Sequence, residues 1–333
     1  MKHSLVTGGA GFIGSHLVEA LLDRGDRVSV IDNESTGSVE NLARIIDHER
    51  LSYTKGTVAD RDLVRESLEG VDEVYHLAAA VGVELIARSP IHTIETNIYP
   101  TELILSELDR RHQQGQAVKL FLASTSEVYG KNPMKLYAEE DDLVFGPTTR
   151  ARWSYGASKA IDEFLALAYW REHRLPVVVG RFFNVVGPRQ SPAYGMVLPR
   201  FVEAALAGRK LTVHDDGHQV RCFAYVLDIV RLVMELMQNS EATGRVFNIG
   251  SDEPVEILEL ARRVIRAVDP AADVDARTEF ISYAEAYSPD FEDCRHRVPD
   301  LSRLYETVEF RPIFGLDETI SRVLDWKQSE SRG

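Results

Sequence analysis

The sequence predicts an α/β fold, with a doubly wound parallel sheet followed by a smaller C-terminal lobe. Short apolar strands alternate with helical patterns, which is typical of a parallel sheet covered by helices on both faces. Strands are expected at residues 3–8, 27–32, 51–56, 71–78, 119–125 and 176–182, and helices at 15–24, 93–113 and 158–172. A chain of 333 residues, 44% of them hydrophobic, can bury a large core and is long enough for two lobes.

The two lobes are expected to be interwoven. Proline becomes frequent past the middle of the chain, and residues 244–250 look like a strand that returns to the main sheet. No linker or internal repeat separates the halves. The first domain is therefore assigned to residues 1–185 and about 220–250, and the second to residues 186–219 and 251–330.

The composition argues against several classes of function. The formal net charge of −14 opposes binding to nucleic acids and to anionic membranes. No apolar run reaches the roughly 18 residues of a membrane-spanning helix. Two cysteines are too few for a disulfide framework, and the N-terminus enters a strand without a signal-like segment. These features favour a cytoplasmic protein with no nucleic-acid or membrane partner.

A glycine-rich turn predicts a dinucleotide site. In TGGAGFIG, Gly8, Gly11 and Gly14 lie between a strand and a helix, where glycines allow a tight turn and let a pyrophosphate approach the helix N-terminus. Asp32 ends the next strand, where a carboxylate can bind ribose hydroxyls of NAD and repel the 2′-phosphate of NADP. The sequence therefore favours NAD as the cofactor.

A Tyr and a Lys four residues apart form a candidate catalytic pair. In YGASK, Tyr155 and Lys159 fall on one face of a helix. There the Lys159 ammonium would lower the pKa of the Tyr155 phenol, so that Tyr155 could act as an acid and a base near neutral pH. Spacing alone decides little, but the pair follows a strand that ends in STSE at 124–127. Both segments fall where a doubly wound sheet exposes its carboxyl edge. That strand end is polar, we infer, because it faces a reacting substrate.

Six segments together resemble the extended short-chain dehydrogenase/reductases that modify nucleotide sugars, the NAD-dependent epimerase/dehydratase family: TGGAGFIG, HLAA at 76–79, STSEVYG, YGASK, RFFNVVGPRQ and FNIG at 247–250. The resemblance covers essentially the whole chain. It implies a Rossmann-type first domain that holds NAD, a second lobe that binds a sugar nucleotide, and a homodimer joined through two helices per subunit.

The resemblance also implies roles for single residues. Thr125, Tyr155 and Lys159 become the catalytic trio, with Tyr155 deprotonating a sugar hydroxyl while the carbon gives hydride to NAD. The implied NAD contacts are Gly8, Gly11, Phe12, Ile13, Gly14, Asp32, Asn33, Leu77, Ala78, Ala79, Tyr155 and Lys159.

Three reactions of this family pass through a transient ketone at sugar C4. A 4-epimerase returns the hydride and needs no second acid or base at C5. A 4,6-dehydratase removes the C5 proton and expels the C6 hydroxyl, for which its dTDP-glucose branch carries Asp-Glu after the Thr. A decarboxylase loses CO2 from a uronic acid and needs a proton at C5 and a group that holds the enolate oxygen.

The residues after Thr125 favour decarboxylation. Ser126 and Glu127 resemble the UDP-glucuronate decarboxylases, although GDP-mannose dehydratases can show a similar string. The segments GPTTRARWSYGASK, QVRCFAYVLD and YSPDFEDCRHRVPD are similar to the decarboxylase of the aminoarabinose pathway. That match implies Arg221 at the sugar carboxylate or the diphosphate and Arg297 at the diphosphate. One departure is Ile86, which stands where these decarboxylases carry a Tyr.

Other residues complete the expected site. Catalysis is assigned to Thr125, Ser126, Glu127, Tyr155 and Lys159, and substrate binding to Glu84, Arg88, Thr125, Asn184, Arg189, Arg221 and Arg297. Asn184 could equally cap a turn, and the arginines could be surface ion-pair partners. The histidines lack metal-ligand spacing, so no metal is expected.

The sequence thus predicts an NAD-dependent decarboxylase of UDP-glucuronate. It would yield UDP-xylose if the hydride returns, or the UDP-4-keto-pentose if release comes first. The alternatives are a UDP-sugar 4-epimerase, acting on glucose or glucuronate, and a nucleotide-sugar 4,6-dehydratase. The alternative outside enzymology is an NAD-sensing scaffold that has kept the fold without the chemistry.

Overall fold

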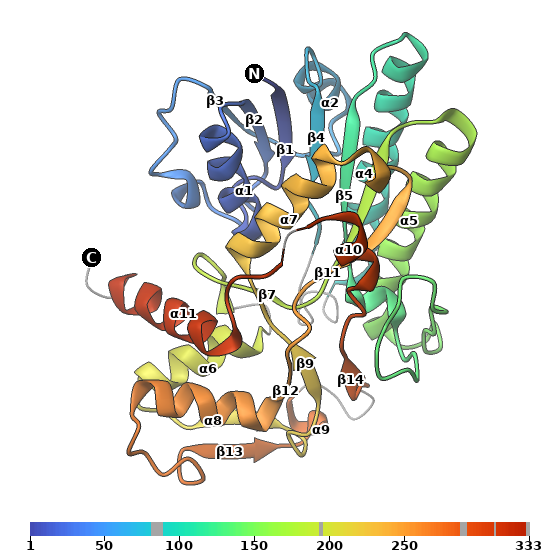
Figure 1. Ribbon diagram of the computed structural model, residues 1–333. Helices are drawn as coiled ribbons and strands as arrows, with labels where there is room; N and C mark the ends of the chain where they lie inside the picture. Colours follow the sequence, from blue (N-terminus) through green and yellow to red (C-terminus); the bar gives the residue numbers. More distant parts are fainter. Residues whose placement is uncertain (81–88, 193–195, 287–291, 310, 331–333) are drawn as a thin grey trace.

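A sheet of seven parallel strands forms the centre of the computed structural model (Figure 1), which describes residues 1–80, 89–192, 196–286, 292–309 and 311–330. The strand order is β3-β2-β1-β4-β5-β6-β11. The strands are β1 (His3–Thr7), β2 (Arg27–Asp32), β3 (Leu51–Lys55), β4 (Glu73–His76), β5 (Lys119–Thr125), β6 (Val177–Phe182) and β11 (Arg245–Ile249). The predicted α/β fold with a doubly wound parallel sheet is confirmed.

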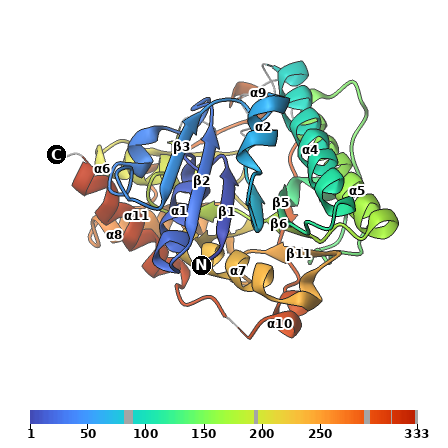
Figure 2. The same cartoon turned by 90° about the horizontal axis from the view of Figure 1, so that it is seen from above.

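Helices cover both faces of this sheet (Figure 2). One face carries α1 (Phe12–Asp23) and α7 (Val226–Gln238), and the other carries α2 (Arg61–Ser67), α4 (Pro90–Gln113) and α5 (Ser154–His173). Successive side chains of a strand point to opposite faces. Val6 therefore packs with the α1 and α7 core, whereas Leu5 packs with the core under α2, α4 and α5.

The C-terminal half builds a second, smaller cluster below the sheet (Figure 1). Three helices, α6 (Val197–Leu206), α8 (Ile257–Val268) and α11 (Leu316–Glu330), share one buried apolar core. Small sheets join β8 (Leu211–His214) to β13 (Thr278–Ile281), and β9 (Val220–Cys222) to β12 (Pro254–Glu256) and β14 (His296–Arg297). β10 (Ala224–Tyr225) pairs with β7 (Val185–Val186). The short helices are η1 (Val39–Leu42), η2 (Ser126–Tyr129), η3 (Ala151–Trp153), η5 (Ser240–Ala242), α9 (Tyr283–Ala286) and α10 (Ser302–Thr307).

The starts of three helices differ from the expectation, among them that of α4, which begins at Pro90 rather than near residue 93. α1 begins at Phe12 rather than near residue 15, because Gly11 is its N-cap and the glycine turn runs directly into the helix. α5 begins at Ser154 rather than near 158. The earlier start places Tyr155 in the first turn of α5, next to the end of β5.

The strand order creates the crevice that the site uses. β1 lies between β2 and β4, so the chain runs from β1 toward one edge of the sheet and later returns to β4 on the other side of β1. In doubly wound sheets, ligands bind outside the carboxyl ends of the strands at such a switch point. Among the described helices, none combines the length and apolar character needed to cross a bilayer.

A buried ion pair ties α5 to the sheet. Arg181 of β6 donates from Nη2 to Glu163 of α5 at 2.7 Å, and both side chains are nearly inaccessible. Replacing Arg181 by Met would leave a buried, unpaired carboxylate. We expect Arg181→Met to lower the free energy of unfolding by about 3–5 kcal/mol, measured by urea denaturation.

The control for this measurement is Glu330→Ala, which removes an exposed ion-pair partner of Lys327 at the end of α11. Its effect should stay within about 0.5 kcal/mol. A loss in Arg181→Met no larger than in this control would contradict the structural role of the Arg181–Glu163 pair.

Candidate functional site

One cleft of about 1530 Å³ lies between the carboxyl edge of the sheet and the C-terminal cluster. Its walls come from the glycine turn, the ends of β2, β4 and β5, the start of α5, and the segments around α6, β8 and β9. Single-ligand pockets commonly measure about 300–1,000 Å³. The cleft is therefore large enough for a cofactor and a second ligand side by side.

The glycine turn is shaped for a dinucleotide. Gly8 has a φ of +73°, and a Cβ at this position would lie 2.8 Å from the backbone nitrogen of Ala78. A Cβ on Gly14 would overlap the carbonyl oxygen of Gly8. The turn leads into the N-terminus of α1, where free N–H groups and the helix dipole attract a phosphate.

Asp32 stands at the ribose end of this turn. Its carboxylate accepts hydrogen bonds from the backbone N–H groups of Ala10 at 2.9 Å and Glu34 at 2.7 Å, which fixes its orientation. The residue lines the cleft although it is mostly buried. Each carboxylate oxygen has more than one lone pair, so both can still accept from ribose hydroxyls. The residues present fit a dinucleotide whose ribose carries no 2′-phosphate.

Thr125 and Tyr155 meet at the floor of the cleft. Thr125 is the last residue of β5, and its hydroxyl interacts with the phenol of Tyr155. Burial and the negative charge of Glu127 raise the pKa of Tyr155, whereas the hydrogen bond with Thr125 lowers it. The net direction is upward, opposite to the lowering expected from Lys159.

Asp162, the partner of Lys159, adds a smaller contribution in the same upward direction. The ammonium nitrogen of Lys159 lies 2.7 Å from Oδ2 of Asp162, one turn along α5, and both side chains are buried. A carboxylate at this distance offsets the positive charge that the sequence analysis had assigned to the activation of Tyr155.

Glu127 lies between two arginines. One carboxylate oxygen is 2.5 Å from Nη1 of Arg152 and the other is 2.5 Å from Nη1 of Arg297. Burial of Glu127 opposes ionisation, but the two guanidinium groups outweigh it and hold the pKa of Glu127 well below its usual range. Glu127 is therefore a carboxylate, and it can serve as a proton donor only after one arginine is drawn away.

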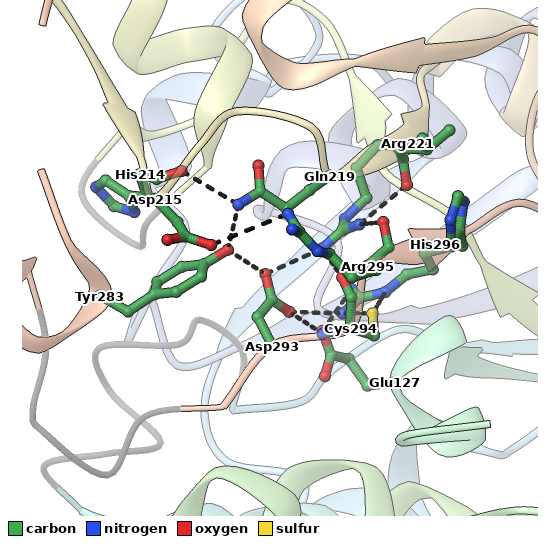
Figure 3. A network of polar contacts seen from close by, with 12 residues as sticks. Glu127, His214, Asp215, Gln219, Arg221, Tyr283, Asp293, Cys294, Arg295 and His296 are labelled. Carbon is green, nitrogen blue, oxygen red and sulfur yellow. Dashed lines mark hydrogen bonds and ion pairs between the residues drawn. The ribbon is translucent and has the colours of Figure 1, made fainter. Parts of the chain in front are cut away.

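Asp293 joins this group from the C-terminal half (Figure 3). Arg221 contacts Asp293 at 2.9 Å, and the hydroxyl of Tyr283 donates to the same carboxylate at 3.3 Å. Arg152 and Arg297 lie 3.8 Å and 3.6 Å from its other oxygen. Among the described residues, three guanidinium groups thus face two carboxylates, and these five side chains carry one net positive charge for an anionic ligand.

The structure brings most of the expected site residues to one cleft. The lining includes Gly8, Gly11, Phe12, Ile13, Gly14, Asp32, Asn33, Leu77, Ala78, Ala79, Thr125, Ser126, Glu127, Tyr155, Lys159, Asn184, Arg221 and Arg297. Asn184 also donates from its amide nitrogen to the carbonyl oxygen of Cys222 at 2.8 Å. Glu84, Arg88 and Ile86 lie outside the described residues.

Arg189 does not belong to the cleft lining. Its guanidinium pairs with Glu19 of α1 at 2.6 Å, and its backbone has a φ of +67°. This ion pair turns the side chain toward α1. The expected substrate contact of Arg189 stays a prediction.

Sequence reasoning missed three residues of the site. Arg152 stands three positions before Tyr155, inside a segment already noted for its resemblance to a decarboxylase, so its position was a usable signal. Asp293 likewise lies in a segment noted for that resemblance, but its partners Arg152 and Arg221 come from distant parts of the chain, so its place in the cluster could not be derived from the sequence. Asp162 was masked by its helical position, where a carboxylate is ordinarily a surface residue.

No cluster of three or more His, Cys, Asp or Glu side chains suited to a metal occurs within the described ranges. His76, at the end of β4, is buried and hydrogen-bonded to Thr7 and Thr101. Burial and the charge of Lys159 lower the pKa of His76 to about 3, so it stays neutral.

The chain matches known proteins along nearly its whole length. The family model described as GDP-mannose 4,6 dehydratase matches residues 5–323. A UDP-N-acetyl-alpha-D-glucosaminuronate decarboxylase of Bacillus cytotoxicus is 35% identical over 98% of this chain and 97% of that protein. UDP-glucuronic acid decarboxylase 1 of Arabidopsis thaliana is 34% identical over 96% of this chain and 68% of that protein.

Solved structures give the same picture. The UDP-glucose 4-epimerase of Thermus thermophilus, in complex with NAD, superimposes with a TM-score of 0.82 at 29% identity and covers 98% of this chain and 99% of its own. The UDP-N-acetylglucosamine 4-epimerase of Methanobrevibacter ruminantium reaches a TM-score of 0.85, also at 29% identity, with 99% of each chain covered. The resemblance identified from the motifs is confirmed.

The pH dependence of stability should report the ion pairs of Glu127. Its folded pKa lies below the ordinary value near 4.5, so its stabilisation is complete above that value and is lost as the pH falls toward the folded pKa. In Glu127→Gln this loss should vanish. Between about pH 4.5 and 3, its unfolding free energy should fall less steeply than that of the wild type, by at most about 1.4 kcal/mol per pH unit.

Urea unfolding at a series of pH values measures these slopes. The matched control is Glu140→Gln, which removes a largely exposed carboxylate beside Arg303 and should keep the wild-type slope. Identical slopes in Glu127→Gln and the wild type would show that Glu127 is not held ionised.

Proposed function

This chain belongs to the GDP-mannose 4,6 dehydratase family, and we propose that it is an NAD-dependent decarboxylase of UDP-glucuronic acid that works through a C4-keto intermediate. The observation that carries this function is the net positive cluster around Glu127, beside Thr125 and Tyr155 in the same cleft. A neutral hexose brings only its diphosphate, whereas a uronate adds a carboxylate near the reacting carbon. The cluster offers guanidinium groups for both.

NAD would lie along the glycine turn with a ribose at Asp32, and it supplies the chemistry of taking a hydride from C4 and giving one back. The first domain, residues 1–185 and about 220–250, would hold it. The second, residues 186–219 and 251–330, would bind the sugar nucleotide. Gly8, Gly11 and Asp32 of the first domain and Arg297 of the second all line the cleft, which supports this proposal.

Tyr155 takes the proton of the C4 hydroxyl as the hydride leaves, while Thr125 hydrogen-bonds the same oxygen. The resulting β-keto acid loses CO2, because the electrons of the broken bond pass to the C4 oxygen as an enolate. Thr125 and the protonated Tyr155 then stabilise that oxygen. Return of the hydride and of the proton gives UDP-xylose, and earlier release gives the UDP-4-keto-pentose.

Glu127 supplies the proton that C5 needs after CO2 has left. A uronate carboxylate that pairs with Arg152 or Arg297 removes from Glu127 one of the charges that keep it ionised. The pKa of Glu127 therefore rises when the substrate binds, and the residue can carry a proton to C5. Ser126, buried beside it, is placed to orient the exchange.

We also propose a cytoplasmic homodimer. The outer surfaces of α4 and α5 expose several large apolar side chains: Ile91, Ile94, Tyr99, Ile161 and Phe164. The two helices pack side by side, and neighbouring exposed apolar groups of this kind mark an interaction surface. Pairing of this surface with a second copy would bury it.

A mass spectrum of the products tests the function. The purified chain is incubated with NAD and UDP-glucuronate, with the 2-acetamido analogue, or with neutral UDP-glucose. The 2-acetamido uronate is a second candidate substrate because the Bacillus relative, similar along nearly the whole chain, is named for it. We expect a product lighter by CO2 from a uronate, or by CO2 and two hydrogens if the ketone is released.

Variants sharpen this result. Arg297→Met should slow CO2 loss by about 100-fold or more, whereas the neighbouring Arg295→Met should not, because Arg295 is half-exposed and pairs with Asp216 outside the cleft. An unchanged mass with a new C4 configuration would make the protein an epimerase. Loss of water from UDP-glucose would make it a dehydratase, and no turnover at all would support the NAD-sensing scaffold.

Cofactor choice should depend on Asp32. In Asp32→Asn, the carboxylate that accepts from the ribose and repels a 2′-phosphate is gone. We expect NAD to bind about 10- to 100-fold more weakly and the preference over NADP to shrink, measured by calorimetry with each dinucleotide. The control is Asp60→Asn at the N-terminus of α2, outside the cleft, which should bind both as the wild type does. Unchanged NAD affinity in Asp32→Asn would remove Asp32 from the site.

A further inference from the structure

Lys159 shares a buried ion pair with a carboxylate that the proposed chemistry does not use. The distance from its ammonium nitrogen to Oδ2 of Asp162 is 2.7 Å, and the exposed fractions of the two side chains are 3% and 0%. A fully buried carboxylate is costly unless it is paired. Asp162 is therefore held at this position by the ammonium group beside it, close enough to Tyr155 to act on the phenol through its charge.

The groups around the Lys159–Asp162 pair are either neutral or paired with another charge. From α4, Thr101 faces Asp162 as a neutral hydrogen-bonding group. From β4, His76 lies near Lys159 but stays neutral, with its pKa lowered to about 3 by burial and by the Lys159 charge. On α5 itself, Glu163 is occupied by Arg181.

Tyr155 has a second charged neighbour on its other side. Glu127 of η2 faces it, as does the neutral hydroxyl of Thr125 at the end of β5. Both carboxylates, Glu127 and Asp162, raise the pKa of the Tyr155 phenol, after burial as the largest cause. Glu127 already has two guanidinium partners, whereas Asp162 pairs directly with Lys159, the ammonium group that the proposed function assigns to activation of the phenol.

We propose that Asp162 is a positioning residue that holds Lys159 and offsets its charge beside Tyr155, and thereby sets the pH range in which Tyr155 works. This proposal rests on the proposed function, in which Tyr155 is the base at the C4 hydroxyl. An unopposed ammonium group would favour the phenolate at lower pH. With Asp162 in place, the phenol keeps its proton to higher pH and the pair adds no net charge to the buried floor of the cleft.

The pH profile of kcat/KM tests the charge effect. Tyr155 must lose its proton to act as a base, so the rate falls as the pH drops through its apparent pKa. Asp162→Asn removes the negative charge and keeps the shape of the side chain. We expect the acid limb to move to lower pH by about one unit. Asp162→Glu restores the charge and should return the limb toward the wild-type position.

Two further variants control this measurement. Glu107→Gln removes a buried carboxylate from α4, where Glu107 pairs with Arg65 and Arg110, and should leave the limb unmoved. Asp162→Ser repeats the loss of charge in a smaller side chain, so the question stays answerable if Asp162→Asn does not fold. An acid limb that stays in place in both neutral variants, or moves to higher pH, overturns the proposal.

A spectroscopic titration gives a readout that does not depend on turnover. Tyrosinate absorbance is followed against pH in the NAD-loaded protein without substrate, and the signal of Tyr155 is isolated by subtracting a Tyr155→Phe protein in each background. Tyr155 should ionise at lower pH in Asp162→Asn than in the wild type. If this shift is seen while no CO2 is released from any uronate, the proposed function fails and the role of Asp162 stands. If CO2 is released but the titration of Tyr155 does not shift, the proposed function stands and the role of Asp162 fails.

Discussion

The ion cluster of Glu127, Asp293 and their three arginines is the interaction on which the rest of the site depends. Its members come from opposite sides of the cleft: Glu127 follows β5 of the main sheet, while Asp293 and Arg297 belong to the C-terminal half. Removing one partner from a buried pair of carboxylate and guanidinium groups leaves an uncompensated buried charge, which is strongly destabilising. The cluster therefore fixes the distance between the two halves at the place where the substrate must lie.

The same cluster links binding to chemistry. A site with more guanidinium groups than carboxylates attracts an anion. In the proposed function, the carboxylate of the substrate competes with Glu127 for Arg152 and Arg297, so these guanidinium groups become available to the substrate. The floor below is built on the same principle, since the ammonium of Lys159 is paired with Asp162.

Local patterns were sufficient for the framework. The alternation of apolar strands with helices gave the doubly wound sheet, and the glycine spacing gave the turn before α1, because both depend on residues that are neighbours in sequence. The Tyr155–Lys159 spacing was likewise local and holds in α5. Helix starts were misplaced by a few residues, since the glycine turn enters α1 without a side-chain cap. Arg189 was assigned to the substrate on its motif, yet its partner Glu19 lies 170 positions away.

The sequence by itself determined the fold class and the dinucleotide turn, because short-range patterns on strands and helices dictate both. The reacting trio of Thr125, Tyr155 and Lys159 was implied by the family resemblance and stays a prediction. Only the tertiary structure decided the ionisation states of Glu127 and Tyr155. Whether Glu127 is ionised depends on Arg152 and Arg297, and the state of Tyr155 depends on its burial and on the carboxylate beside Lys159. Such states are set by burial and by charges brought together from distant segments, which no local pattern contains.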